Sequence, residues 1–335
     1  MNNLNNDKAI LIAEIGGNHE GSLSKAIDLM YEANENGADI IKFQSYSGEG
    51  LVNKKLNKER YDHFNRFMLS DDQWHLLAEA ALKKNINFSS SVWDIHYFQL
   101  LDKYISVYKV GSGDLNNFKM IESIVKTKKS IILSTAMSDL SMIKKIYNFV
   151  TGLDSQIVKD GRLGILQCSA IYDNPIHSLM NISVMKTFKK EFKCKVGFSN
   201  HAMGINPSLA AIANGADILE FHYTDNKEKE FRDHKLSFDK TDLKFVSKFN
   251  NEIREIMGSS KKSILEDEAS NEKEFRRGVF LNKSLKKGDT VNLSDLVFLR
   301  PQAGISYWDY NKIIGKCLKK DITEYEPLSF DDFKI

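Results

Sequence analysis

Eight short apolar runs, separated by helix-like stretches, constrain this 335-residue chain more than any other feature. The intervening stretches place apolar residues on one helical face, as Ala26, Leu29, Met30 and Ala33 show. Alternation of strand and helix eight times favours a closed parallel (β/α)8 barrel, the TIM barrel of the α/β class. A doubly wound open sheet is the alternative, because a strand count from one sequence can be wrong by one or two. The runs begin at Ala9, Ala38, Asn87, Val107, Ser130, Leu163, Lys195 and Ile218.

Two of these runs are nearly the same, NGADIIKFQ and NGADILEFH. Side chains of a strand alternate between its two faces, so Lys42 shares a face with Gln44, and Glu220 shares the corresponding face with His222. The two runs would be the second and the eighth strand, and alternate strands of a barrel fill common layers. We therefore expect Lys42 and Glu220 in one layer, and Gln44 and His222 in the layer nearer the mouth.

The chain divides by pattern into a barrel domain (residues 1–256), a linker (257–275) and a small β-rich domain (276–335). The linker is expected because its sequence is polar and mostly lacks periodicity. The last part has strand-like runs joined by a tight Gly-Asp turn. Within the barrel, residues 46–85 form a long insertion with many aromatic residues, which is longer than a typical βα connection. We expect this insertion to fold over the mouth as a lid.

Composition gives no reason to expect nucleic acid or a membrane as partner. The net charge is +2, with 27% charged and 42% hydrophobic residues, as in ordinary globular proteins. No apolar run approaches the roughly 20 residues that a membrane helix needs, and the first ten residues lack the signal-peptide pattern. The three cysteines have no metal-type spacing and cannot all pair. A reducing cytoplasm is therefore the expected location.

Polar residues stand late in the predicted strands, where barrels of this kind keep their active sites. Because several of them would point at one mouth, we expect a shared site. Its candidate members are Glu14, Lys42, Gln44, Lys109, Ser112, Ser134, Ser199, His201 and His222.

His201 and His222 would end neighbouring strands, whose backbones run about 4.8 Å apart. Two imidazoles so placed can bind one divalent metal and leave positions open for water and substrate oxygens. The alternative is that each histidine is an ordinary hydrogen-bonded side chain. Lys42 and Lys109, with nearby hydroxyls and the small residues of GSG at 111–113, suit a phosphate or a carboxylate. Two alternatives stay open: a lysine that forms a Schiff base with substrate, or lysines paired with Glu220 or Glu14 inside the barrel.

Five segments resemble the sialic acid synthase family: IAEIGGNHEGSLSKAIDLMYEANENGADIIKFQS, YKVGSGDLNN, IILSTAMS, GFSNHAMG and LEFHYT. A sixth, KKGDTVNLSDLVFLRPQAGIS, resembles the antifreeze-like (SAF) domain that follows the barrel in that family. The resemblance implies condensation of phosphoenolpyruvate with an N-acetylated aminosugar aldehyde to make a nonulosonic acid for a surface glycan. It also implies a divalent metal, Mn²⁺ first and Mg²⁺ or Co²⁺ next, and a domain-swapped homodimer in which one SAF domain covers the partner's barrel.

The resemblance also implies roles for individual residues. Glu14 matches an acidic residue close to the reacting groups, and His201 and His222 match the metal pair. Asp233 matches an aspartate that contacts the sugar, and Arg300 an arginine that reaches over from the partner chain. Residues that match phosphoenolpyruvate contacts are Lys42, Lys109, Ser112, Ser134 and Ser199, and those that match sugar contacts are Gln44 and Tyr172.

Three positions and one short string depart from the family pattern. The string is YDNP at 172–175, which replaces the customary Tyr-Pro-x-Pro. Asn200 stands where an aspartate is usual, Ala170 replaces a polar residue, and Trp93 stands where a phenylalanine is common. The metal pair and both lysines are retained, which favours an active enzyme with an unusual sugar substrate. The alternatives are another phosphoenolpyruvate-dependent 3-deoxy-ulosonate synthase, a Schiff-base aldolase, or a non-catalytic sugar-binding homologue. The acceptor stays open among sialic, legionaminic, pseudaminic and spore-coat sugars.

Overall fold

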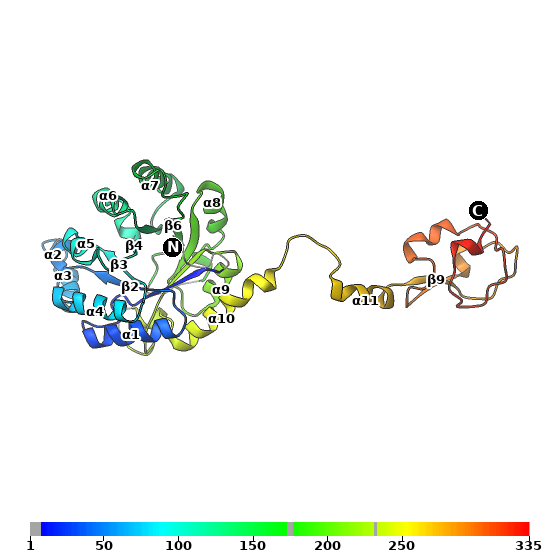
Figure 1. The fold of residues 1–335 in the computed structure, drawn as a ribbon, viewed down its shortest axis with the longest axis horizontal. Coiled ribbons are helices and arrows are strands. Elements are labelled where there is room, and N and C mark those ends of the chain that lie inside the picture. Colours follow the sequence, from blue (N-terminus) through cyan, green and yellow to red (C-terminus); the bar gives the residue numbers. More distant parts are fainter. Residues whose placement is uncertain (1–7, 173–176, 231–232, 335) are drawn as a thin grey trace. The chain divides into compact units, whose positions relative to one another are not determined.

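The computed structural model describes residues 8–172, 177–230 and 233–334, and the chain forms two compact units, Met1–Gly258 and Ser259–Ile335. The first unit is a closed barrel in which each parallel strand pairs with the next and β8 pairs with β1 (Figure 1). All eight expected runs are strands, so the barrel prediction is confirmed and the open sheet is wrong. The strands are β1 (Ile10–Glu14), β2 (Ile40–Ser45), β3 (Phe88–Val92), β4 (Val107–Val110), β5 (Ser130–Ser134), β6 (Leu163–Cys168), β7 (Lys195–Asn200) and β8 (Ile218–His222).

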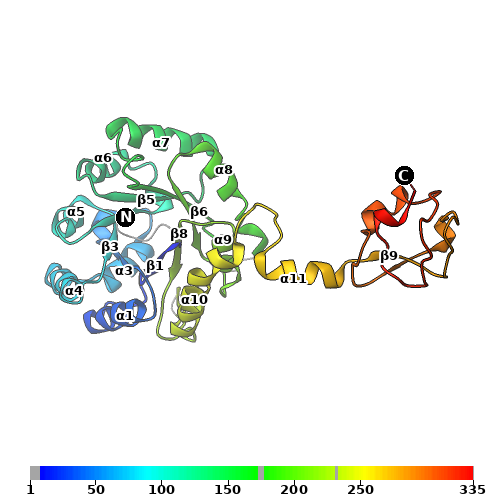
Figure 2. The ribbon, with the colours of Figure 1, turned by 45° about the vertical axis from the view of Figure 1, so that its right-hand side comes forward.

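Helices form a ring around the strands, as Figure 2 shows. Several begin at side chains that accept a hydrogen bond from the first turn, such as Ser22, Asp94 and Asp139. Such caps satisfy backbone N–H groups that have no partner within the helix. The helices of the ring are α1 (Leu23–Glu35), α4 (Asp71–Lys83), α5 (Ile95–Leu101), α6 (Phe118–Lys126), α7 (Leu140–Leu153), α8 (Val184–Glu191), α9 (Asn206–Ala213) and α10 (Lys240–Met257).

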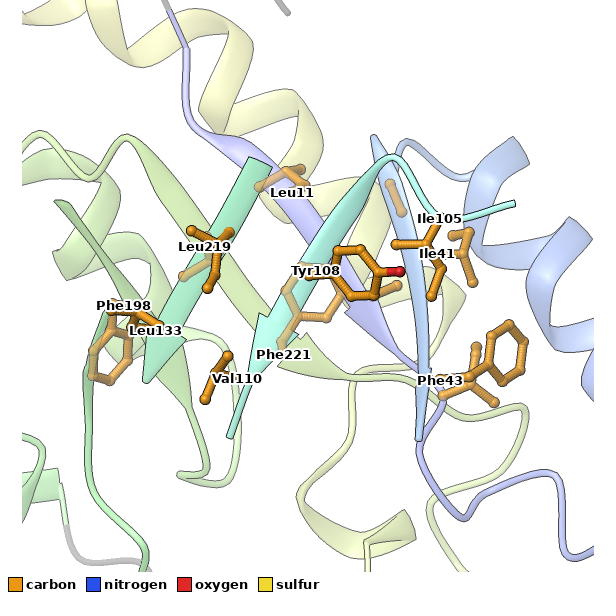
Figure 3. Packing of buried hydrophobic residues seen from close by; sticks show 14 of the residues in the cluster. Leu11, Ile41, Phe43, Ile105, Tyr108, Val110, Leu133, Phe198, Leu219 and Phe221 are labelled. Carbon is orange, nitrogen blue, oxygen red and sulfur yellow. The ribbon is translucent and has the colours of Figure 1, made fainter. Parts of the chain in front are cut away.

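In six of the eight strands the two faces pack into different cores. Outward residues such as Leu11, Ile41, Phe43 and Phe221 belong to the large cluster between strands and helices (Figure 3). Burying one such side chain stabilises the fold by about 1.5–3 kcal/mol. A smaller cluster fills the barrel itself, and its members are Ile10, Ile12, Ile40, Val107, Ile132, Leu166 and Ile218. The period-two prediction for β2 and β8 is therefore confirmed.

The insertion between β2 and α4 contains two further helices, α2 (Gly48–Leu51) and α3 (Lys58–Phe67). Helix α3 buries Phe64. The Phe64 ring meets Tyr46, which follows β2, edge to face at 4.9 Å, and Trp93, which follows β3, at 6.0 Å. These aromatic contacts attach the insertion to the ends of two strands, which is where the sequence places the lid.

The second unit has its own hydrophobic core, centred on Val279, Leu281 and Leu328. Strands β9 (Gly278–Leu281) and β10 (Leu296–Leu299) pair antiparallel in it. Residues 257–275, expected as a linker, contain helix α11 (Glu266–Phe275), which buries none of its residues. Three acidic residues in its first turn interact favourably with the helix dipole. In the part of the chain that the structure describes, no helix has the length and apolar character to cross a membrane.

At Gly197 the backbone of β8 leaves no room for a side chain on β7. A Cβ at this position would lie 2.1 Å from the carbonyl oxygen of its register partner, Ile218. Because that neighbour is backbone, Gly197→Ala should lower the free energy of unfolding by about 2 kcal/mol or more, measured by urea titration followed by circular dichroism. Gly152→Ala is the control, since no described atom lies within 4 Å of its added Cβ. This helical replacement should be neutral or stabilising by about 0.5–1 kcal/mol. Equal stability of the two variants would contradict the packing described for β7 and β8.

Candidate active site

A cavity of about 540 Å³ opens at the carboxyl ends of the strands, a size typical of small-molecule sites. Its lining includes residues from the ends of all eight strands. The structure brings together eleven of the twelve predicted site residues in this lining: Glu14, Lys42, Gln44, Lys109, Ser112, Ser134, Tyr172, Ser199, His201, His222 and Asp233. The twelfth, Arg300, belongs to the second unit and directly follows β10. Its place in the site stays a prediction.

Buried ion pairs form the floor of the cavity. The Glu220 carboxylate lies 3.4 Å from Nζ of Lys42 and 3.3 Å from Nζ of Lys109. Lys42 also contacts the Glu14 carboxylate, and Lys109 donates a hydrogen bond to Oγ of Ser134 at 2.6 Å. Lys42 and Glu220 are in contact, as expected of side chains in one layer of the barrel interior. The pairing of both lysines with buried carboxylates, which the sequence left open, is present as well.

Burial and mutual attraction determine the charges of this group. Burial lowers the pKa of Lys42 to about 8, although Glu220 opposes the shift. Burial alone would raise the pKa of Glu220, but Lys109 and Lys42 lower it to about 2. Glu220 is therefore ionised at neutral pH and holds two ammonium groups beside each other. One carboxylate oxygen of Glu14, Oε1, is buried and has no hydrogen-bond partner among the described residues, so it is available to a substrate hydroxyl or a water.

His201 and His222 face each other across the mouth with ring centroids 5.4 Å apart. Nδ1 of His201 donates to the carbonyl oxygen of Ser169 at 3.0 Å, so Nε2 carries the lone pair and accepts from the Tyr172 hydroxyl at 3.1 Å. Burial lowers the pKa of His201 to about 3, which keeps the imidazole neutral, as metal ligation requires. Within 8–172, 177–230 and 233–334, no group of three or more His, Cys, Asp or Glu residues is placed to hold a metal ion.

The three single positions that depart from the family pattern all line the cavity. Residues 173–175 of the YDNP string lie outside the described residues. The Asn200 amide holds the loop after β7, since its oxygen accepts from the backbone N–H of Ala202 at 3.0 Å and its nitrogen donates to the carbonyl of Gly204 at 3.5 Å. Trp93 stacks on Tyr46 with centroids 5.2 Å apart. Ala170 contributes a methyl group where a polar contact was expected.

Sequence reasoning did not identify the side chains that the insertion contributes to the cavity. Arg60, His63 and Phe64 of α3 and Leu51 of α2 line the cavity, although they precede β3 by more than twenty residues. The aromatic content of residues 46–85 indicated a lid but not which side chains reach the mouth. Asp114, after β4, also lines the cavity and was missed, because an aspartate in a turn is usually a solvated side chain.

Comparison with known proteins gives a consistent result. Residues 29–262 match the model of the NeuB family, and residues 276–334 match that of the SAF domain. The chain belongs to the NeuB family. The observed antiparallel pair β9–β10 accordingly lies in a SAF domain.

Several relatives of this NeuB-family chain are named acid synthases. The N,N'-diacetyllegionaminic acid synthase of Campylobacter jejuni is 32% identical over 95% of this chain and 98% of that protein. The pseudaminic acid synthase of the same species is 28% identical over 100% of this chain and 99% of its own length. The crystal structure of the N-acetylneuraminic acid synthetase of Leptospira borgpetersenii, in complex with citrate, is 27% identical with a TM-score of 0.71, covering 79% of this chain and 90% of that chain. The chain is therefore an enzyme, a nonulosonic acid synthase.

Replacing Glu220 should expose how much the fold depends on the buried charges. Glu220→Gln keeps the shape but removes the carboxylate that pairs with Lys109, for which no other ion pair is present among the described residues. Because a buried charge would lose its partner, the free energy of unfolding should fall by about 3 kcal/mol, measured by urea titration. The control is Glu122→Gln, which breaks an exposed pair with Lys126 and should change stability by less than about 0.5 kcal/mol. Similar losses of unfolding free energy in both variants would show that the buried ion pairs stabilise the fold no more than the exposed pair does.

Proposed function

We propose that the barrel cavity condenses phosphoenolpyruvate with an N-acetylated aminosugar aldehyde and releases inorganic phosphate. The observation that carries the proposal is the meeting of two lysines, three serines and two imidazoles at one mouth. Cations and hydroxyls suit a phosphorylated carboxylate, and the imidazoles suit a divalent metal. The named activities of the relatives support the same reaction class.

Lys42 and Lys109 would bind the anionic groups of phosphoenolpyruvate, with hydroxyl donors at Ser112, Ser134 and Ser199. In the reaction, the methylene carbon of phosphoenolpyruvate attacks the aldehyde carbon and forms the new C–C bond. Water then adds to the cation-like C2, and the C2–O bond to phosphate breaks. One water is consumed and one phosphate released, so the atoms balance.

Glu14, Asp233, Gln44 and Tyr172 would handle the acceptor and its protons. The unpartnered Oε1 of Glu14 would accept a proton from the attacking water or bind an acceptor hydroxyl. Asp233 and Gln44 line the cavity above the lysines and would accept and donate hydrogen bonds to sugar hydroxyls. The Tyr172 hydroxyl, now bonded to His201, would be freed for the acceptor when that nitrogen is ligated.

His201 and His222 would hold the metal, with Mn²⁺ preferred and Mg²⁺ or Co²⁺ as substitutes. Their donor chemistry fits, because His201 presents Nε2 as its acceptor nitrogen while Ser169 fixes the tautomer. A bound divalent ion would supply Lewis acidity toward the aldehyde oxygen. The three cysteines are free, which supports a reducing cytoplasm as the location.

The assay that tests this function measures phosphate release from phosphoenolpyruvate against a panel of N-acetylated aminosugar aldehydes. Release should require an acceptor, stop with chelator and return with added Mn²⁺. His222→Ala should lose metal binding by calorimetry, at unchanged circular dichroism, because one of two imidazole ligands is gone.

Two results of that assay would contradict the proposal. Full activity in the presence of chelator would show that the reaction needs no metal ion. Borohydride trapping of substrate on Lys42 or Lys109 would establish a Schiff-base aldolase in its place.

A homodimer, in which the SAF domain of one chain covers the partner's barrel, is part of the proposal. It is supported by the resemblance described above and by the separate core of the second unit. Arg300 would then donate hydrogen bonds to acceptor oxygens of the partner's site while water is excluded.

Mixing Arg300→Ala chains with His222→Ala chains tests this arrangement. Neither homodimer should turn over well, but a mixed dimer has one barrel with both imidazoles and an intact arginine supplied in trans. Random pairing should restore activity up to about a quarter of the wild-type rate per chain, measured by phosphate release. Arg300→Ala alone should raise the acceptor KM far more than the phosphoenolpyruvate KM. No recovery despite proven subunit exchange would mean that Arg300 acts within its own chain or outside the site.

A further inference from the structure

Carboxylates outnumber cations among the side chains that line the cavity. With the imidazoles left aside, three cations face four carboxylates in this lining. An anion that carries both a phosphate and a carboxylate must therefore enter a cavity whose fixed charges do not attract it overall. The cations are Lys42, Arg60 and Lys109, and the carboxylates are Glu14, Asp114, Glu220 and Asp233.

The two lysines are already occupied before substrate arrives. Lys42 and Lys109 are buried, and both pair with Glu220. A charge so neutralised at the floor of the cavity exerts little field at its entrance. Arg60 is different because it is exposed on α3 and makes no ion pair with any carboxylate in the described ranges.

Aromatic contacts hold Arg60 at the edge of the mouth. Its guanidinium lies over the Phe64 ring, 5.5 Å from the centroid, a contact worth about 0.5–1 kcal/mol at an exposed site. Phe64 in turn packs edge to face against Tyr46 and Trp93, which follow β2 and β3. The cation is therefore tied to the barrel and not to the lid helix alone.

We propose that Arg60 draws the anionic substrate into the cavity and binds its charge at the entrance. The inference deepens the proposed function, because it takes phosphoenolpyruvate as that anion. An unpaired guanidinium in an otherwise acidic mouth raises the local concentration of anions and speeds association. Its planar array of N–H donors also matches phosphate or carboxylate oxygens. Arg60 thus acts on binding, while the buried lysines act on the bound substrate.

The chain contains a matched control for this residue. Arg66 is exposed on the same helix and lies over the Phe67 ring at 5.3 Å, but it does not line the cavity. Arg60→Ala and Arg66→Ala therefore remove the same charge and the same kind of ring contact. Only Arg60→Ala also changes the lining of the cavity.

The experiment measures phosphoenolpyruvate binding by calorimetry, and kcat/KM for phosphoenolpyruvate, at low and high salt. Arg60→Ala should weaken both by about tenfold at low ionic strength and by clearly less at high ionic strength, because salt screens exposed charges. Arg66→Ala should stay within about twofold of wild type, and Arg60→Lys should recover part of the loss. The acceptor KM should stay within about twofold in all variants.

Three results would overturn the inference: equal effects of Arg60→Ala and Arg66→Ala, an Arg60→Ala loss that does not depend on salt, or a loss confined to the acceptor KM. The last result would assign Arg60 to an acceptor, such as a phosphorylated sugar. Failure of the proposed function has a different signature. In that case no aldehyde supports phosphate release, yet calorimetry still reports salt-dependent binding of phosphoenolpyruvate that Arg60→Ala weakens.

Discussion

The carboxylate of Glu220, shared by two buried lysines, is the interaction on which the rest of the site depends. Two ammonium groups inside a barrel repel each other and lose their hydration, and both effects are energetically unfavourable. Glu220 offsets both, since it lies within 3.4 Å of each nitrogen. Its own pKa falls to about 2 as a result. The cations that would bind substrate exist as a pair because an anion lies between them.

That arrangement has a consequence for the cavity as a whole. Lysines neutralised at the floor leave the entrance under the influence of Asp114, Asp233 and the exposed Arg60. A highly charged substrate must then be attracted by groups other than those that bind it during the reaction. Attraction and binding can be divided between different groups for a physical reason. A buried ion pair is shielded from salt, whereas an exposed guanidinium acts on charges at a distance.

Residues on the insertion and the strand ends form one continuous wall at the mouth. Phe64 of α3 contacts Tyr46 and Trp93, so the lid segment is attached where β2 and β3 end. The polar part of the lining differs from this aromatic part, because it consists of nitrogen and hydroxyl groups of His201, His222 and Tyr172. An acceptor sugar with apolar C–H faces and polar hydroxyls would meet both kinds of surface. Trp93, which departs from the family pattern, lies in this wall.

The sequence by itself determined the barrel, because apolar residues at period two and period 3.6 alternate eight times and leave few other ways to bury them. It also determined that polar residues such as Lys42 and His222 gather at one end, since all strand ends of a parallel barrel point the same way. It did not determine which charges pair: only packing shows that Glu220 bridges both lysines. Nor did it identify Arg60, because α3 reaches the mouth through contacts of Phe64 with residues far along the chain, and such contacts depend on tertiary structure and not on local pattern.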